Sequence, residues 1–197
     1  MNTPNKLTIG RMIATPIFMA TMLIHFPYHY TVSLILFIAA SLTDMIDGKM
    51  ARKYNLITDF GKFLDPLADK MLTTAAFLGF MGINFGAGWK MQITWIVFIV
   101  LFREFLVTSS RLVVVSSGGK VIAANMWGKC KTVSQMAGII FALLTCAIRY
   151  DFGVCNAAFW TVSNITVGVL FWISAVLCII SGTIYLLASK EYIDPSK

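Results

Sequence analysis

Six apolar segments of about 20 residues each constrain this chain more than any other feature. Hydrophobic residues make up 58% of its 197 residues, and the mean hydropathy is +0.78. An apolar helix of this length crosses the hydrocarbon core of a bilayer. We therefore predict an all-α integral membrane protein with six transmembrane helices. The predicted spans are residues 9–28, 31–52, 61–84, 91–115, 132–149 and 160–188.

The length of the chain leaves no room for a sizeable soluble domain beside these spans. We predict one transmembrane domain over residues 1–197, with a short polar segment at residues 1–8. No cleavable signal peptide is expected, because the first apolar run contains Pro16 and lacks a small-residue cleavage site.

The formal net charge of +7 is unevenly distributed over the loops. One set of flanks is basic, whereas the opposite loops carry only Lys90 and Arg149. The positive-inside rule predicts a multi-pass protein with both termini in the cytoplasm. Nucleic acid is not an expected partner, because these charges fringe a membrane domain. The basic flanks contain Lys6, Arg11, Lys49, Arg52, Lys53, Lys62, Lys120, Lys129, Lys131, Lys190 and Lys197.

Four aspartates lie inside the second and third predicted spans, where an uncompensated carboxylate is expensive. Asp44 and Asp47 are three residues apart and Asp65 and Asp69 four apart, so each pair shares one helix face. If the two helices turn these faces together, four carboxylates meet in one pocket. Oxygen ligands suit hard divalent cations. Two such ions sharing carboxylates are a common device for phosphoryl transfer.

An ion-pairing role and a transport role are also compatible with aspartates at these positions. Ion pairs with Arg52, Lys62 or Lys70 are the structural alternative, but four acids at these spacings exceed what pairing requires. A divalent-cation transporter would also use acids inside the membrane. Transport would leave the small residues beside the acids without a role, namely Gly48, Ala51 and Gly61, which give a bulky ligand access to the backbone.

The acids form part of one longer pattern, D-x2-D-G-x2-A-R-x8-G-x3-D-x3-D, from Asp44 to Asp69. This pattern resembles the signature of the CDP-alcohol phosphotransferase family, and every fixed position is present. The resemblance implies a catalytic membrane domain with two adjacent helices that hold two Mg²⁺ or Mn²⁺ ions and the CDP pyrophosphate.

The resemblance also implies roles for individual residues. Asp44, Asp47, Asp65 and Asp69 are the expected metal ligands, and Asp69 is also our candidate for the catalytic general base. The polar start of the chain looks like the family's opening, where Asn and Thr face the nucleotide. Arg52 either contacts a phosphate or supports an aspartate. The expected site for the CDP-lipid comprises Asn5, Thr8, Gly48, Ala51, Arg52 and Gly61.

Basic residues further along the chain indicate a second, anionic substrate. Arg103 and Arg111 lie two turns apart on the fourth predicted span, and Lys129 and Lys131 precede the fifth. Arginine forks match phosphate oxygens. The structural alternative pairs Glu104 with one of the arginines. We expect these four basic residues to form a pocket for a small phosphorylated alcohol.

The stretch that begins at Arg103-Glu104 and the later G-K-x-K-T-x2-Q stretch look like the phosphatidylglycerophosphate synthase branch of the family. That likeness implies transfer of the phosphatidyl group from CDP-diacylglycerol to sn-glycerol 3-phosphate, giving phosphatidylglycerophosphate and CMP, in glycerophospholipid biosynthesis. Another acceptor, such as inositol phosphate, serine or phosphatidylglycerol, remains an alternative. The expected setting is the cell (inner) membrane, with the active site at the cytoplasmic face, membrane lipids as partners and a homodimer by family analogy.

The fifth and sixth predicted spans carry almost no charge, and we interpret them as scaffold and lipid-facing surface. Gly138, Gly168 and Gly182 are expected to allow close helix packing there. His25 and His29 are expected at the membrane interface and not as ligands.

Overall fold

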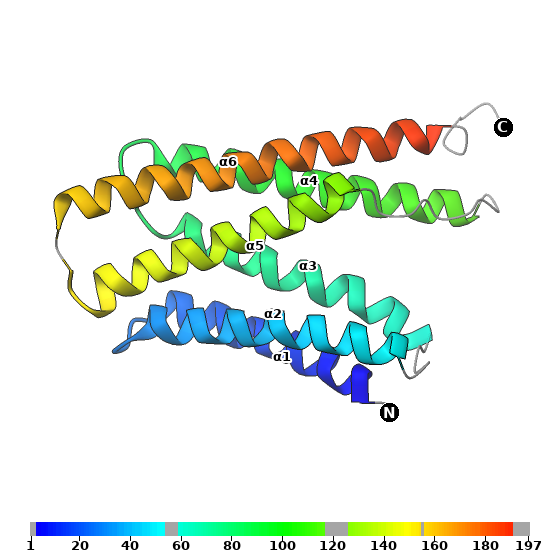
Figure 1. Cartoon of the computed structure of the whole chain (residues 1–197), viewed down its shortest axis with the longest axis horizontal. Coiled ribbons are helices and arrows are strands. Elements are labelled where there is room, and N and C mark those ends of the chain that lie inside the picture. Colours follow the sequence, from blue (N-terminus) through cyan, green and yellow to red (C-terminus); the bar gives the residue numbers. More distant parts are fainter. Residues whose placement is uncertain (1–2, 54–58, 117–125, 155, 191–197) are drawn as a thin grey trace. The chain divides into compact units, whose positions relative to one another are not determined.

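The structure, a computed structural model, describes residues 3–53, 59–116, 126–154 and 156–190. Over these ranges the chain is helical, without strands, and its helices are drawn in Figure 1. A π-helical turn, η1 (Ala147–Asp151), continues the fifth helix. The predicted all-α class is confirmed, and the described residues form six α-helices. The α-helices are α1 (Thr3–Leu23), α2 (His29–Lys53), α3 (Asp59–Met81), α4 (Trp89–Ser116), α5 (Met126–Cys146) and α6 (Ala157–Ala188).

Length and composition mark three stretches of the described chain as able to cross a membrane. These stretches are His29–Ile46, Met126–Asp151 and Ala157–Ala188. The same criteria do not single out α1, α3 and α4, each of which carries charged residues. Membrane crossing by these three helices therefore stays a prediction.

The first predicted span differs most from the structure. The sequence placed a polar segment at residues 1–8 and the helix at 9–28, but α1 begins at Thr3 and ends at Leu23. Thr8 lies inside the helix and not at its start. The helix ends before Pro27, since proline disfavours a helical residue in front of it. At the polar start of α1, Asn5 and Thr8 are buried, which local composition did not predict.

The Cα packing divides the chain into two compact units. Unit 1 comprises Met1–Gly86 and Ile139–Asn164, and unit 2 comprises Ala87–Gly138 and Ile165–Lys197. Unit 1 therefore holds α1, α2, α3, η1 and one end each of α5 and α6. Unit 2 holds α4 and the rest of α5 and α6. The single domain predicted over residues 1–197 stays a prediction.

In unit 1, α1 packs against both α2 and α3. The start of α1, the end of α2 and the start of α3 lie at one end of this unit (Figure 1). Buried side chains recur on α1 every three or four residues, as expected for a single buried helix face. The half of this face near the start of the chain is polar and the other half is mostly apolar. Its members are Asn5, Thr8, Arg11, Thr15, Phe18 and Met22.

The π-helical turn stabilises the opposite end of unit 1. One carboxylate oxygen of Asp151 accepts hydrogen bonds from the backbone N–H of Thr31 at 2.6 Å and from its hydroxyl at 2.7 Å. Thr31 lies in the first turn of α2, where backbone N–H groups have no partner inside the helix. The guanidinium of Arg149 lies 3.8 Å from the ring centroid of Trp160. These contacts fasten η1 to α2 and to the start of α6.

In unit 2, α4 and α6 run in the same direction. Trp89 near the start of α4 faces Phe171, with ring centroids 6.1 Å apart, and Arg111 near its end faces Tyr185. The close packing expected at Gly138 is confirmed, because a Cβ atom there would lie 2.9 Å from Phe171 Cδ1. At Gly182 a Cβ atom would lie 3.0 Å from an arginine side chain of α4.

Candidate active site

The signature residues lie on α2 and α3, as their spacing predicted. Asp44 and Asp47 stand one turn apart on α2, and Asp65 and Asp69 stand one turn apart on α3. Of these four carboxylates only that of Asp44 belongs to the described side chains. The side chains of Gly48, Ala51, Arg52 and Gly61 also lie outside them, together with those of the other three aspartates. Their convergence on metal and CDP-lipid therefore stays a prediction.

Asp44 makes an ion pair that the sequence did not indicate. Its Oδ1 accepts a hydrogen bond from Nη1 of Arg11 on α1. The Arg11 side chain is only 1% exposed, whereas that of Asp44 is 38% exposed. The sequence placed Arg11 in the basic flanks without a role at the site, although its i, i+3 spacing from Thr8 puts both residues on one helix face. The structure makes Arg11 a cationic support for the first signature aspartate.

Asn5 and Thr8 lie on the same buried face of α1 as Arg11. Asn5 is 6% exposed and Thr8 is 1% exposed. A polar side chain inside a protein needs hydrogen-bonding partners, so these residues mark a polar compartment at the Asp44 end of unit 1. Their contact with the nucleotide and with the rest of the expected CDP-lipid site stays a prediction.

The described residues give only a partial test of the expected metal site. Among them, no group of three or more His, Cys, Asp or Glu side chains could hold a metal ion. Asp44 by itself fits the expectation, because its carboxylate oxygens suit Mg²⁺ or Mn²⁺ and its partial exposure lets a cation approach. The other three expected ligands lie outside the described side chains.

In unit 2, two of the predicted basic residues meet on one carboxylate. Oε1 of Glu104 accepts a hydrogen bond from Nη1 of Arg103 at 3.1 Å and another from Nζ of Lys131. The side chains of Arg103, Glu104 and Lys131 are 15%, 15% and 10% exposed. Nη2 of Arg103 also donates to Oγ of Ser181 at 3.0 Å. Residues of α4, α5 and α6 thus build one largely buried cluster with a net charge of about +1.

The other two predicted basic residues lie apart from this cluster. Arg111 is exposed on α4, with its guanidinium carbon 5.4 Å from the ring centroid of Tyr185. Lys129 is exposed at the start of α5. Pairing of Glu104 with an arginine, the structural alternative considered from the sequence, is observed for Arg103. The single negative charge of Glu104 balances one of the two positive charges of Arg103 and Lys131, and the second positive charge remains.

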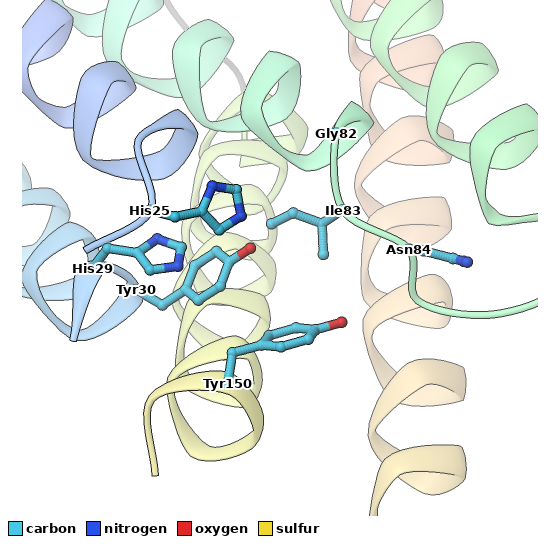
Figure 2. Close-up of a pocket in the computed structure, with 7 residues that line it drawn as sticks. All are labelled: His25, His29, Tyr30, Gly82, Ile83, Asn84 and Tyr150. Atoms are coloured by element: carbon cyan, nitrogen blue, oxygen red, sulfur yellow. The ribbon is translucent and has the colours of Figure 1, made fainter. Parts of the chain in front are cut away.

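A pocket of about 370 Å³ lies at the other end of unit 1. Figure 2 shows His25, His29, Tyr30 and Tyr150 around it, and the His29 and Tyr30 rings are 3.9 Å apart between centroids. His29 is buried and its Nδ1 lies 3.3 Å from the carbonyl oxygen of Thr21, while His25 is exposed. Along α2 this pocket is roughly 20 Å from Asp44 at 1.5 Å per residue. It is therefore separate from the signature aspartates.

Comparison with known proteins decides the family. The sequence model of the CDP-alcohol phosphatidyltransferase family matches residues 1–180. The chain belongs to this family. The resemblance drawn from the signature between Asp44 and Asp69 is thereby confirmed, and so is the helical membrane fold that it implied.

Similar proteins within the family span nearly the whole chain. The CDP-diacylglycerol–glycerol-3-phosphate 3-phosphatidyltransferase of Bacillus subtilis is 37% identical, over 99% of this chain and 98% of that protein. The protein of the same name from Rickettsia bellii is 34% identical, over 97% of each chain. The CDP-diacylglycerol–glycerol-3-phosphate 3-phosphatidyltransferase 2 of Arabidopsis thaliana is 35% identical, over 71% of this chain and 63% of that protein. The chain is thus a membrane protein built like these bacterial members of the family.

Proposed function

We propose that this protein transfers the phosphatidyl group of CDP-diacylglycerol to sn-glycerol 3-phosphate. One observation carries the proposal: family members that are named for this activity align with the chain over 97–99% of its length. In the reaction, a hydroxyl oxygen of the acceptor bonds to the lipid-linked phosphorus. The bond from that phosphorus to the CMP oxygen breaks, and CMP leaves with the electron pair. The products are phosphatidylglycerophosphate and CMP.

The residues of the signature hold the donor and take the proton in this proposal. Asp69 accepts the proton of the attacking hydroxyl, which becomes acidic as the new bond forms. Asp44, Asp47, Asp65 and Asp69 would hold two Mg²⁺ or Mn²⁺ ions, which would supply positive charge against that of the pyrophosphate. The polar face of α1 binds the nucleotide end of the lipid through Asn5 and Thr8. The remaining donor contacts come from Gly48, Ala51, Arg52 and Gly61.

The cluster around Glu104 supports an anionic acceptor. Arg103 and Lys131 bring two positive charges into a space that is largely closed to water, and Glu104 balances only one of them. An anion that enters is attracted more strongly there than at an exposed surface, because screening by water is weaker. Arg111 and Lys129, both exposed, attract the phosphate from solution. A neutral acceptor such as serine would make this arrangement unnecessary.

The cellular setting is part of the same proposal. The basic flanks favour an orientation with both termini and the aspartates on the cytoplasmic side of the inner membrane. There, soluble glycerol phosphate enters from water while the acyl chains of the donor stay in lipid. We also propose a homodimer, by analogy with the family.

The test is CMP release by the purified protein in detergent with CDP-diacylglycerol and Mg²⁺. The acceptors are sn-glycerol 3-phosphate, inositol phosphate, serine and phosphatidylglycerol, each supplied alone. We expect release with glycerol phosphate, and its loss in Asp69→Asn at unchanged thermal stability. Release with a different acceptor would refute the assigned substrate. Absence of release with all four, together with cation flux in liposomes, would refute the transferase.

A further inference from the structure

The guanidinium of Arg103 is held in place by α6, a helix that the sequence marks only as scaffold. Its Nη2 donates to Oγ of Ser181 at 3.0 Å, across 78 positions of the chain. The aliphatic part of Arg103 lies against Gly182, where a Cβ atom would stand 3.0 Å from Cγ and 3.7 Å from Nε. Adjacent residues of α6 therefore fix both the charged end and the stem of this arginine.

The hydrogen bonds around Ser181 have a defined direction. The Ser181 hydroxyl donates to the backbone carbonyl of Cys178 at 3.2 Å. Its oxygen is then left to accept from Arg103, which has only donors. Ser181 is 1% exposed, so water does not compete for this position. Arg103 donates to Ser181, and Ser181 donates to the backbone of α6. Together these two hydrogen bonds fix the orientation of the guanidinium.

Two nitrogens of the Arg103 fork are engaged and the third is not. Nη1 donates to Glu104 and Nη2 to Ser181, while Nε is buried without a hydrogen-bond partner among the described residues. A buried donor without a partner is costly unless a ligand or water satisfies it. Phosphate oxygens match pairs of guanidinium donors. The guanidinium of Arg103 is therefore held in one orientation, and its Nε–H remains available as a donor.

We propose that Ser181 and Gly182 are positioning residues that orient Arg103 for the phosphate of the acceptor. Neither residue touches the substrate. Ser181 sets the rotation of the guanidinium, and Gly182 provides the space for the Arg103 stem to lie against α6. This assignment rests on the proposed function, because it takes glycerol phosphate as the ligand of the cluster.

The first test compares two serines of α6. Ser181→Ala removes the acceptor for Nη2, whereas Ser174→Ala removes an equally buried hydroxyl without an arginine contact. For Ser181→Ala we expect the KM for glycerol phosphate to rise about tenfold, as for loss of one hydrogen bond to a charged group. The KM for CDP-diacylglycerol should match that of Ser174→Ala. Ser181→Thr keeps the hydroxyl and should restore the acceptor KM.

The second test compares two glycines of α6. Gly182→Ala places a methyl group 3.0 Å from Arg103 Cγ and forces the stem to move. Gly168→Ala is the matched control, because its nearest neighbour would be Gln92 Oε1 at 3.9 Å. We expect Gly182→Ala to raise the KM for glycerol phosphate severalfold with little change for the lipid, and Gly168→Ala to change neither.

The outcomes separate this inference from the proposed function. If the wild-type protein releases no CMP with glycerol phosphate, the proposed function fails and the inference fails with it. If the wild type is active but Ser181→Ala behaves like Ser174→Ala, only the inference is refuted. A uniform fall in kcat and stability, with both KM values unchanged, would show that Ser181 only joins α4 to α6 and would also refute it.

Discussion

Replacement of Asp151 by alanine should loosen the start of α2. The carboxylate accepts two hydrogen bonds from Thr31, at 2.6 Å from N and 2.7 Å from Oγ1. Loss of an N-terminal helix cap costs about 1–2 kcal/mol. Hydrogen bonds to a charged group contribute about 1.5–3 kcal/mol. Because Asp151 is only half-buried, we expect a loss of about 2–3 kcal/mol in unfolding free energy.

Thermal unfolding in detergent micelles, followed by circular dichroism, measures this effect. For a chain of this size, 1 kcal/mol shifts Tm by about 2–4 °C, so Asp151→Ala should lower Tm by about 4–12 °C. Asp151→Asn keeps an acceptor oxygen without the charge and should lose roughly half as much. Thr31→Val should lose about 1 kcal/mol, and Thr31→Ser, which keeps both donors, is the control.

A double-mutant cycle isolates the contact itself. Asp151→Ala combined with Thr31→Val should be little worse than Asp151→Ala alone, because both changes remove the same hydroxyl bond. CMP release well below Tm should be unchanged, since Asp44 lies roughly 20 Å further along α2. A Tm within about 1 °C of the wild type for Asp151→Ala, or full additivity of the two changes, would refute the assigned role.

Three further predictions concern packing, support of the signature and the metal. Gly138→Ala should lower Tm, because its Cβ atom would lie 2.9 Å from Phe171 Cδ1. Gly10→Ala should raise the unfolding free energy by up to about 1 kcal/mol, because nothing lies within 4 Å of the added Cβ atom. Thermal melting of both variants checks this prediction. Arg11→Ala should reduce CMP release about 10–100-fold, as expected for loss of a group that orients a metal ligand. Arg11→Lys should recover part of this activity. Equal activity of Arg11→Ala and the wild type would contradict the role of Arg11 as the partner of Asp44. Removal of divalent cations with EDTA should abolish CMP release, and added Mg²⁺ or Mn²⁺ should restore it; release that persists in EDTA would exclude the two-metal site.

The sequence predicted most of the helices because apolar length is a strong local signal. The ranges predicted for α2 and α6 agree with the structure to within a few residues. The prediction was poorest at α1, where polar residues from Thr3 onward continue the helix. Their polarity indicated a segment that precedes the first span, but it belongs to α1, which packs against α2 and α3 with Asn5 and Thr8 buried. Burial of this kind depends on tertiary partners, which local composition does not show.

The site was predictable where its chemistry follows helix periodicity. Helix spacing placed Asp44 and Asp47 together on one helix, and two basic stretches selected Arg103 and Lys131 as candidates. The pairing of Arg11 with Asp44 joins positions 33 apart, and that of Lys131 with Glu104 joins positions 27 apart. No short-range pattern specifies such contacts.

The role of α6 shows the same limit more strongly. The helix is almost free of charge, so a scaffold was the natural interpretation of its sequence. Ser181 and Gly182 are ordinary residues in a membrane helix, where small side chains commonly mediate packing. Their relation to Arg103 depends on which residue of α4 lies opposite. Only the three-dimensional structure supplies that information.

The buried polar face of α1 bears on how this protein is assembled in the membrane. During synthesis α1 emerges from the ribosome before α2 and α3, the two helices that cover this face. A guanidinium such as that of Arg11 is expensive in lipid until a carboxylate such as Asp44 is nearby. If α1 crosses the membrane as predicted, insertion one helix at a time would leave this charge without its carboxylate. The first three helices should therefore leave the translocon together, already packed against one another.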